Sequence, residues 1–172
     1  VAKDLGPKPF VLDDREVARI TAFLFHDGGH DDPAPLGANV NRSFIGSYVL
    51  GMGFTFDDEN PDATPLAEME RLIAKDVRNK ERIFPYIGGE EVNDSPTQAH
   101  RRYVINFGEM AEEEARRWPD LMAVLDIKVR PERAKLGDNG DAKRRKRLWW
   151  LWGRYTPALF DTIRSLDRVL VI

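Results

Sequence analysis

The sequence carries its most recognisable chemistry in a basic and aromatic run near the C-terminal end. Five consecutive cations come directly before a tryptophan-rich stretch, and they are Lys143, Arg144, Arg145, Lys146 and Arg147. Lysine and arginine neutralise the phosphates of nucleic acids, and such contacts position a protein on a duplex without choosing a sequence. We therefore expect these cations, together with Arg42 and Arg154, to bind the phosphates of double-stranded DNA.

A structural interpretation accounts for part of the same run. Five successive helical positions cannot all face one side, so some of the cations are expected to form a solvated surface. Tryptophan has a large area that is usually buried, which places some of Trp149, Trp150 and Trp152 in the core. This interpretation leaves the charge contrast along the chain unexplained. Residues 128–154 hold ten Lys or Arg against three Asp or Glu, in a chain of net charge -3.

A second group of polar side chains follows two glycines. Gly88 and Gly89 allow an exposed turn, and Glu90, Glu91 and Asn93 come next. A carboxylate can accept from the amino group of cytosine, and an asparagine amide can pair with the edge of adenine. The three residues are therefore candidates for base reading. The other interpretation, that the segment is polar because turns are polar, stays open.

Two aspartates and a lysine form a pattern that some metal-dependent nucleases use. Asp120 follows a proline, and Asp126 stands two residues before Lys128. In such enzymes two carboxylates hold Mg²⁺ and the lysine supports the attacking water. That chemistry needs a longer connection and a strand, whereas the apolar residues here favour a helix, so we expect no metal. A Mg²⁺-dependent nuclease using Asp120, Asp126 and Lys128 is an alternative function.

The other candidate catalytic groups are incomplete. His26 and His30 have the spacing of a helical metal pair, but the glycines between them favour a loop. His100 has no nucleophile or carboxylate at a motif spacing, which indicates a surface residue. Gly51 and Gly53 lack the third glycine and the following helix of a dinucleotide-binding fingerprint. The chain has no cysteine, and we expect neither catalytic nor metal-binding residues in it.

The expected elements mix strands with helices. Periodicity and breakers predict β regions at 18–25, 43–56 and 103–107, with an apolar patch at 83–87. Helices are predicted at 64–76, 112–117, 120–131, 141–152 and 157–166, and the expected N-caps are Thr64, Asp120 and Asp141. Glycines in the region 43–56 suggest a bulge or a close backbone approach. The order of elements indicates an α+β fold, a mixed small sheet with several helices.

A linker-like stretch divides the chain. Residues 27–41 hold three glycines, two prolines and three aspartates, a composition typical of linkers. We predict the edge of an upstream domain plus the linker at 1–35, and a main domain at 36–172. The chain starts at Val1 and stops within an apolar run, so we expect an excised piece. No apolar run approaches the ~20 residues of a membrane span, and the lack of cysteine fits the cytoplasm.

Four segments together resemble a known family. In chain order they are Asn41–Ser47 with Leu50–Phe54, Ile83–Asn93, Arg102–Phe107, and Val129–Arg133 with Arg147–Pro157. Their order and spacing resemble the target-recognition region of MmeI-like adenine-N6 DNA methyltransferases, which are restriction-modification enzymes of types IIG and IIL. The resemblance covers most of the chain from Asn39 to Ile172.

This resemblance implies a parent protein whose upstream domain binds S-adenosylmethionine and flips an adenine out of the duplex, while this region reads neighbouring base pairs. The Asn-Pro-Pro-aromatic and glycine-rich cofactor motifs of such enzymes do not occur in this sequence. We therefore expect a truncated DNA target-recognition domain with no cofactor of its own. Its expected partners are double-stranded DNA and the upstream methyltransferase domain in cis, with no membrane. A tryptophan-rich scaffold that docks onto another protein is a further alternative.

Overall fold

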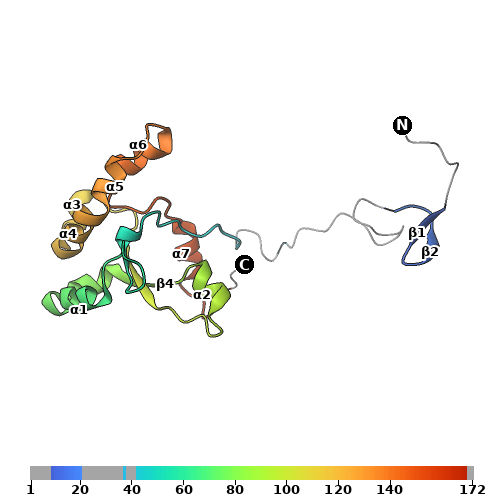
Figure 1. Cartoon of the computed structure of the whole chain (residues 1–172), viewed down its shortest axis with the longest axis horizontal. Coiled ribbons are helices and arrows are strands. Elements are labelled where there is room, and N and C mark those ends of the chain that lie inside the picture. The colour runs from blue at the N-terminus through green and yellow to red at the C-terminus, as the bar shows by residue number, and fades with distance from the viewer. Residues whose placement is uncertain (1–8, 21–36, 38–41, 170–172) are drawn as a thin grey trace. The chain divides into compact units, whose positions relative to one another are not determined.

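The computed structural model describes residues 9–20, 37 and 42–169. The chain divides into two compact units, which we call unit 1 (Val1–Ser43) and unit 2 (Phe44–Ile172) (Figure 1). In unit 1 the strands β1 (Phe10–Leu12) and β2 (Arg15–Val17) pair antiparallel. The two aspartates between them both have positive φ, as a tight two-residue hairpin turn requires.

The strand predicted at 18–25 is not found in the part that the structure describes. Residues 18–20 are not strand. Residues 21–25 lie outside the described residues, as do His26, His30 and nearly all of the predicted linker. The β1–β2 hairpin has no counterpart among the predicted elements, because strands of three residues are too short to show a periodicity.

Unit 2 contains a three-stranded antiparallel sheet with the strand β5 in its middle. The order is β3 (Thr55–Phe56), β5 (Arg102–Ile105) and β4 (Ile83–Tyr86). Val104 of β5 pairs with β3 on one side and β4 on the other, and it is 1% exposed. The proline in β4 has no N–H to donate, which suits an edge strand. The strand predicted at 103–107 is confirmed, one residue earlier and ending at 105.

Helix α1 (Leu66–Lys75) confirms the clearest helix prediction but begins one residue later than expected. Thr64 is not the cap, because its N–H donates to Thr55 O at 2.9 Å and its backbone continues the sheet. The first helical N–H, that of Leu66, is instead satisfied by the carboxylate of Asp58 at 2.8 Å. A side chain from the loop thus replaces the expected cap.

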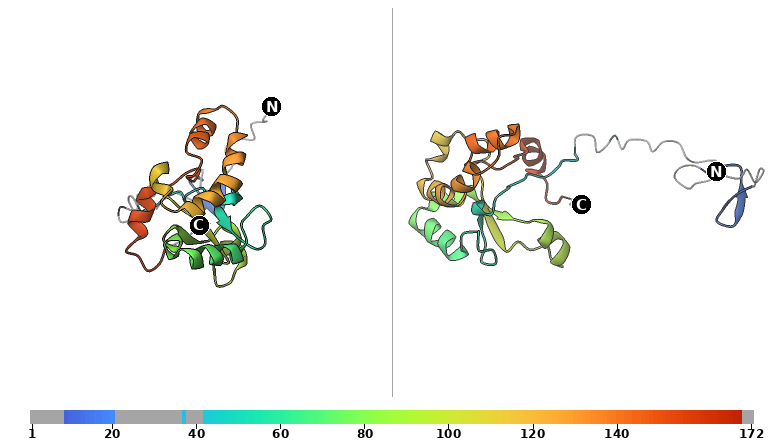
Figure 2. Two further views of the ribbon diagram at one scale, coloured as in Figure 1. Left: turned by 90° about the vertical axis from the view of Figure 1, so that its left-hand side faces the viewer. Right: turned by 45° about the horizontal axis from the view of Figure 1, so that its top comes forward.

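The other helices gather in two groups around the sheet. In Figure 1 helices α3 to α6 form the upper part of unit 2, with α1 and α2 in its lower part, and Figure 2 shows the same grouping. The helices are α2 (Gly89–Asp94), α3 (Glu112–Ala115), α4 (Pro119–Lys128), α5 (Arg130–Ala134), α6 (Gly140–Arg147) and α7 (Pro157–Ile163), with the 3-10 helices η2 (Met52–Phe54) and η3 (Val77–Arg82). These elements confirm the predicted α+β fold.

The β region predicted at 43–56 is wrong over most of its length. Strand β3 begins only at Thr55, after η2. Before η2 a single bridge joins Tyr48 to Arg154. The strand breaks at Leu50 and the glycine after it, because both have positive φ, a conformation that no strand residue adopts.

The helix predicted at 141–152 ends at Arg147, so its aromatic half is not helical. Leu148 leaves the helix with φ −109° and ψ 49°. The next four side chains are all buried, each at most 8% exposed: Trp149, Trp150, Leu151 and Trp152. A helix on a surface buries only one face. Four consecutive large side chains can all be buried because the chain leaves the helix before them.

The close backbone approach inferred from the glycines is confirmed at Gly53, and it generates a prediction. A Cβ at Gly53 would lie 2.8 Å from the Cβ of Lys128 and 2.9 Å from a methyl of Val129. We expect Gly53→Ala to lower the free energy of unfolding by about 1–3 kcal/mol, the usual effect of overpacking. Urea unfolding followed by tryptophan fluorescence measures it.

The control for this prediction is Gly140→Ala at the start of α6. A methyl there meets nothing within 4 Å, and alanine favours a helix over glycine. Gly140→Ala should leave the protein equally stable or slightly more stable. Equal unfolding midpoints for Gly53→Ala and the unmodified chain would contradict the close packing of η2 on α4.

Candidate nucleic-acid interface

Helix α6 carries the five predicted phosphate-binding cations on eight residues. Asn139, rather than the predicted Asp141, caps it, with the side-chain oxygen 2.8 Å from the backbone nitrogen three residues on. Asp141 instead lies in the first turn and pairs with Arg145 at 2.8 Å. Asp138 pairs with Lys146 at 3.2 Å. Two of the five cations are therefore engaged by carboxylates of their own segment.

Four exposed cations near α6 have no ion pair or side-chain hydrogen bond with any residue that the structure describes. Two of them are four residues apart on α6, which puts them on one face of the helix. The third stands at the end of α5 and the fourth follows the tryptophans. We call them the unpaired cations: Lys135, Lys143, Arg147 and Arg154.

Arg144 has a mixed role. Its Nη1 donates to the carbonyl of Gly153 at 2.7 Å, which ties α6 to the chain after the tryptophans. The rest of its guanidinium faces a hollow of about 460 Å³, whose other lining residues are Tyr48, Leu50, Asp141, Gly153, Arg154 and Tyr155. Arg144 is thus held by the fold and still exposed to a ligand in that hollow.

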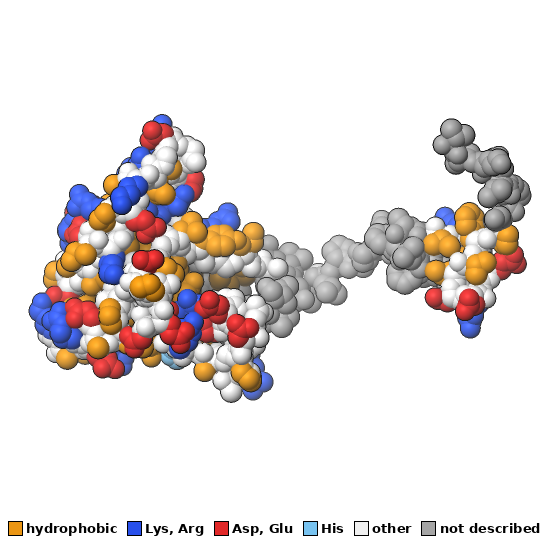
Figure 3. Space-filling view, viewed as in Figure 1, with side chains coloured by type: hydrophobic (Ala, Val, Ile, Leu, Met, Phe, Trp, Pro, Cys, Tyr) orange, Lys and Arg blue, Asp and Glu red, His pale blue; other side chains and the backbone are white. Residues whose placement is uncertain are grey.

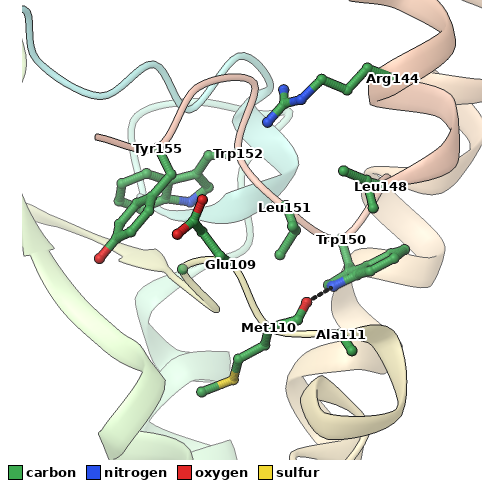
Figure 4. A pocket seen from close by; sticks show the side chains of 10 residues that line it. Glu109, Met110, Ala111, Arg144, Leu148, Trp150, Leu151, Trp152 and Tyr155 are labelled. Atoms are coloured by element: carbon green, nitrogen blue, oxygen red, sulfur yellow. Dashed lines mark hydrogen bonds between the residues drawn. The ribbon is translucent and has the colours of Figure 1, made fainter. Parts of the chain in front are cut away.

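Arg144 also lines a second hollow of about 290 Å³, drawn in Figure 4. In this view the indole of Trp150 donates to the carbonyl of Met110, at 2.9 Å. The indole of Trp152 likewise donates to Ile105 O of the central strand, at 2.8 Å. These buried, hydrogen-bonded indoles belong to the core, as the structural interpretation predicted. They give no support to the alternative of a tryptophan-rich docking scaffold.

The space-filling view agrees with this distribution of charge. In Figure 3 Lys and Arg side chains gather over α5 and α6, with few acidic ones among them, and hydrophobic side chains are exposed beside them. The seventh predicted phosphate-binding residue, Arg42, is exposed but belongs to unit 1. The candidate interface of unit 2 therefore consists of α5, α6 and the segment that carries Arg154.

The exposed turn predicted after Gly88 is wrong, because this segment forms helix α2. Glu91 is 4% exposed, and its carboxylate accepts from the N–H of Gly88 at 2.8 Å and from Arg102 at 2.9 Å. These bonds hold Glu91 inside the fold, away from any base edge. Glu90 and Asn93 are exposed on α2 and remain candidates for base reading.

Arg101 connects α2 to the loop after β3. Its guanidinium lies within ion-pair distance of four carboxylates, those of Asp57, Glu59, Glu90 and Glu91. The separations are 3.5 Å to Asp57, 2.9 Å to Glu90 and 3.6 Å to Glu91. A cation surrounded by so much negative charge is poorly suited to bind a phosphate. Arg101 therefore differs from the unpaired cations.

The three residues of the nuclease alternative do not converge on one point. Asp120 binds Lys75 of α1, while Asp126, further along α4, pairs with Arg130 at 3.1 Å. Lys128 donates to a backbone carbonyl at 3.3 Å. Within the described ranges no group of three or more acidic or histidine side chains is arranged to hold a metal ion. Nothing in this geometry supports the nuclease alternative.

Two smaller candidates are placed on the surface. His100 is exposed and contacts the ring of Tyr103 edge-on, with 5.2 Å between the ring centroids. Gly51 has φ 141° and precedes η2 rather than a nucleotide-binding helix. Neither residue joins a cluster that could carry out catalysis.

Arg133 is a structural residue that was not among the predicted site residues. It is 1% exposed, and its Nη2 donates to Leu50 O at 2.7 Å and to Val49 O at 3.3 Å. Among the described residues no carboxylate lies within ion-pair distance. Burial lowers the pKa of Arg133, and the charge of Arg145 lowers it further. The signal in the sequence is its spacing, because Arg133 continues the four-residue stripe of the buried Leu121, Leu125 and Val129.

Comparison with known proteins adds no relative. Neither the protein-family models, nor the curated proteins, nor the solved structures contain a match to this chain. In the part of the chain that the structure describes, no helix has the length and apolar character needed to cross a membrane. The function therefore has to be argued from the site itself.

The buried pair of Glu91 and Arg102 generates a prediction about pH. Burial alone would raise the pKa of Glu91, but the bonds from Arg102 and Gly88 outweigh it and hold the pKa at about 2. The pKa is thus lower in the folded than in the unfolded chain, so the stabilisation is complete above about pH 5. This contribution to the free energy of unfolding, on the order of 2 kcal/mol, is lost as the pH falls from about 5 towards 2.

Glu91→Gln tests this assignment. The variant should be less stable than the unmodified chain at pH 7, and the difference should shrink as the pH falls to 3. Thermal unfolding at several pH values measures both. The exposed Glu113 provides the control as Glu113→Gln. If Glu91→Gln and Glu113→Gln depend on pH in the same way, Glu91 is not the group that stabilises α2.

Proposed function

We propose that this chain is a DNA target-recognition segment of an adenine-N6 DNA methyltransferase of a restriction-modification system. In this role it positions duplex DNA for base flipping and methylation by an upstream domain, which binds S-adenosylmethionine in the parent protein. The single observation that carries the DNA-binding part is the group of unpaired cations around α6. The methyltransferase context rests on the resemblance of the four sequence segments.

The unpaired cations suit phosphate binding for an energetic reason. A cation that is already paired must give up a carboxylate when it binds a phosphate, whereas an unpaired one exchanges only water and counterions. Lys143 and Arg147 share one face of α6, and Arg154 lines the hollow next to that helix. The pairs of Arg145 and Lys146 are partly exposed. Such surface pairs contribute little and can re-form with phosphates.

Two kinds of contact are assigned to different parts of unit 2. The cations of α5, α6 and Arg154 position the duplex, since phosphate contacts carry no sequence information. Glu90 and Asn93 on α2 are the proposed base-reading residues. Double-stranded DNA and the methyltransferase domain in cis are the proposed partners, and the cytoplasm is the proposed compartment.

The test removes the two free charges of α6 together. We expect Lys143→Gln with Arg147→Gln to weaken binding of any duplex by about tenfold or more at low salt. Two lost phosphate contacts should also flatten the slope of log K against log salt by about 1.8. Fluorescence anisotropy with a labelled duplex at several salt concentrations measures both. Arg144 is left unchanged, because its bond to Gly153 belongs to the fold.

The matched control removes two charges from α1, where Arg71 and Lys75 are also four residues apart. Both are exposed, but both are paired, with Glu68 and Asp120. Arg71→Gln with Lys75→Gln should change affinity and salt slope much less than the α6 variant. Equal effects of the two double variants would show that only net charge matters. DNA binding that is unchanged in the α6 variant would refute the proposed interface.

A further inference from the structure

Hydrophobic side chains are exposed beside the unpaired cations. Tyr48 and Leu50 are each 48% exposed, while Val49 between them is buried. Both side chains line the same hollow of the surface, which places them on one side of the chain. Figure 3 shows exposed hydrophobic side chains next to the basic ones. Two neighbouring large side chains that stay about half exposed beside a basic surface mark a candidate contact site.

The backbone below these two side chains is held from both sides. Tyr48 exchanges two hydrogen bonds of 2.9 Å with Arg154. From within the core, the buried guanidinium of Arg133 binds Leu50 O at 2.7 Å. Leu50 has φ 51°, which is unfavourable for a leucine and persists only where the surroundings impose it. The fold therefore presents Tyr48 and Leu50 in one fixed position.

Tyr48 and Leu50 open into the larger hollow together with two arginines. That hollow, of about 460 Å³, is also lined by Arg144, Arg154 and Tyr155. Tyr48 makes no ring contact with another aromatic residue in the described part of the chain, and about half of its surface is exposed. The hollow thus combines an exposed aromatic residue, an exposed leucine and two cations, and its one carboxylate, that of Asp141, is paired with Arg145. These are the groups that bind a base and its phosphate at once.

We propose that this hollow receives one unstacked nucleotide of the bound DNA, with its base against Tyr48 and Leu50 and its phosphate between Arg144 and Arg154. Aromatic rings stack on the π-face of any base. Leucine is among the side chains that enter between base steps and unstack them. The inference rests on the proposed function, and it adds that the duplex is opened locally where it meets unit 2.

The experiment compares two duplexes that differ in one nucleotide. One is a perfect duplex, and the other carries a single extra unpaired nucleotide. The base of that nucleotide can enter the hollow without the breaking of a base pair. We expect the full chain to bind the bulged duplex about tenfold more tightly, within the range of one stacked base. Tyr48→Ala with Leu50→Ala should reduce this ratio to about one, because it weakens binding of the bulged duplex more than binding of the perfect duplex. Tyr48→Phe keeps the ring and should keep the ratio.

The variants separate this inference from the proposed function. Lys143→Gln with Arg147→Gln should weaken both duplexes equally and leave the ratio near ten. A ratio of one for the unmodified chain, or a ratio that persists in the Tyr48→Ala and Leu50→Ala variant, overturns the stacking role alone. Failure of the unmodified chain to bind either duplex refutes the proposed function and this inference with it. Circular dichroism of each variant checks that it is folded. If the double variant is not folded, Tyr48→Leu, which removes the ring and keeps an apolar side chain, should lower the ratio and decides the matter.

Discussion

A buried guanidinium that binds backbone carbonyls supports the candidate interface. Arg133 binds the carbonyls of Val49 and Leu50, and the chain next to those carbonyls pairs with Arg154. Arg154 in turn follows the tryptophans that close the core. A desolvated cation whose acceptors are removed destabilises a protein strongly. The segment 48–50 is therefore held to α5 by Arg133 and to the chain around Arg154 by backbone hydrogen bonds.

This arrangement explains how one surface can be rigid and still available for binding. Aromatic and backbone contacts hold the tryptophan segment, with Trp150 and Trp152 donating to carbonyls of Met110 and Ile105. Among the exposed cations of α6, Arg144 takes part in that packing through Gly153 O, whereas Lys143 and Arg147 make no ion pair or side-chain hydrogen bond with the described residues. In the α2 region, by contrast, Arg101 and Arg102 form ion pairs with the carboxylates around them. The arginines near α2 therefore stabilise the fold, whereas the unpaired cations near α6 are available to bind a ligand.

Sequence patterns were most reliable where one element had one period and one buried face. Helix α1 and helix α4 were predicted because their apolar residues recur at helical spacing. The central strand was predicted because Tyr103, Val104 and Ile105 are consecutive residues that favour strands. The segment 43–56 failed because Leu50 and Gly51 take positive φ, which is imposed by contacts with the rest of the unit. The helix expected through the tryptophans failed for a similar reason. Burial of four consecutive side chains overrode the local preference of the basic run for helix.

The sequence by itself determined the separation of charge along the chain, the α+β composition and the lack of any thiol chemistry, since these depend on residue types and local order alone. Only the tertiary structure decided which charges are free. Glu91 is not available to read bases, because it is buried and paired with Arg102, which lies eleven residues later in the sequence. Arg133 became structural because its acceptors lie more than eighty residues earlier in the chain. Local periodicity cannot predict such partners, because an ion pair or a buried hydrogen bond depends on distances in space that the whole fold establishes.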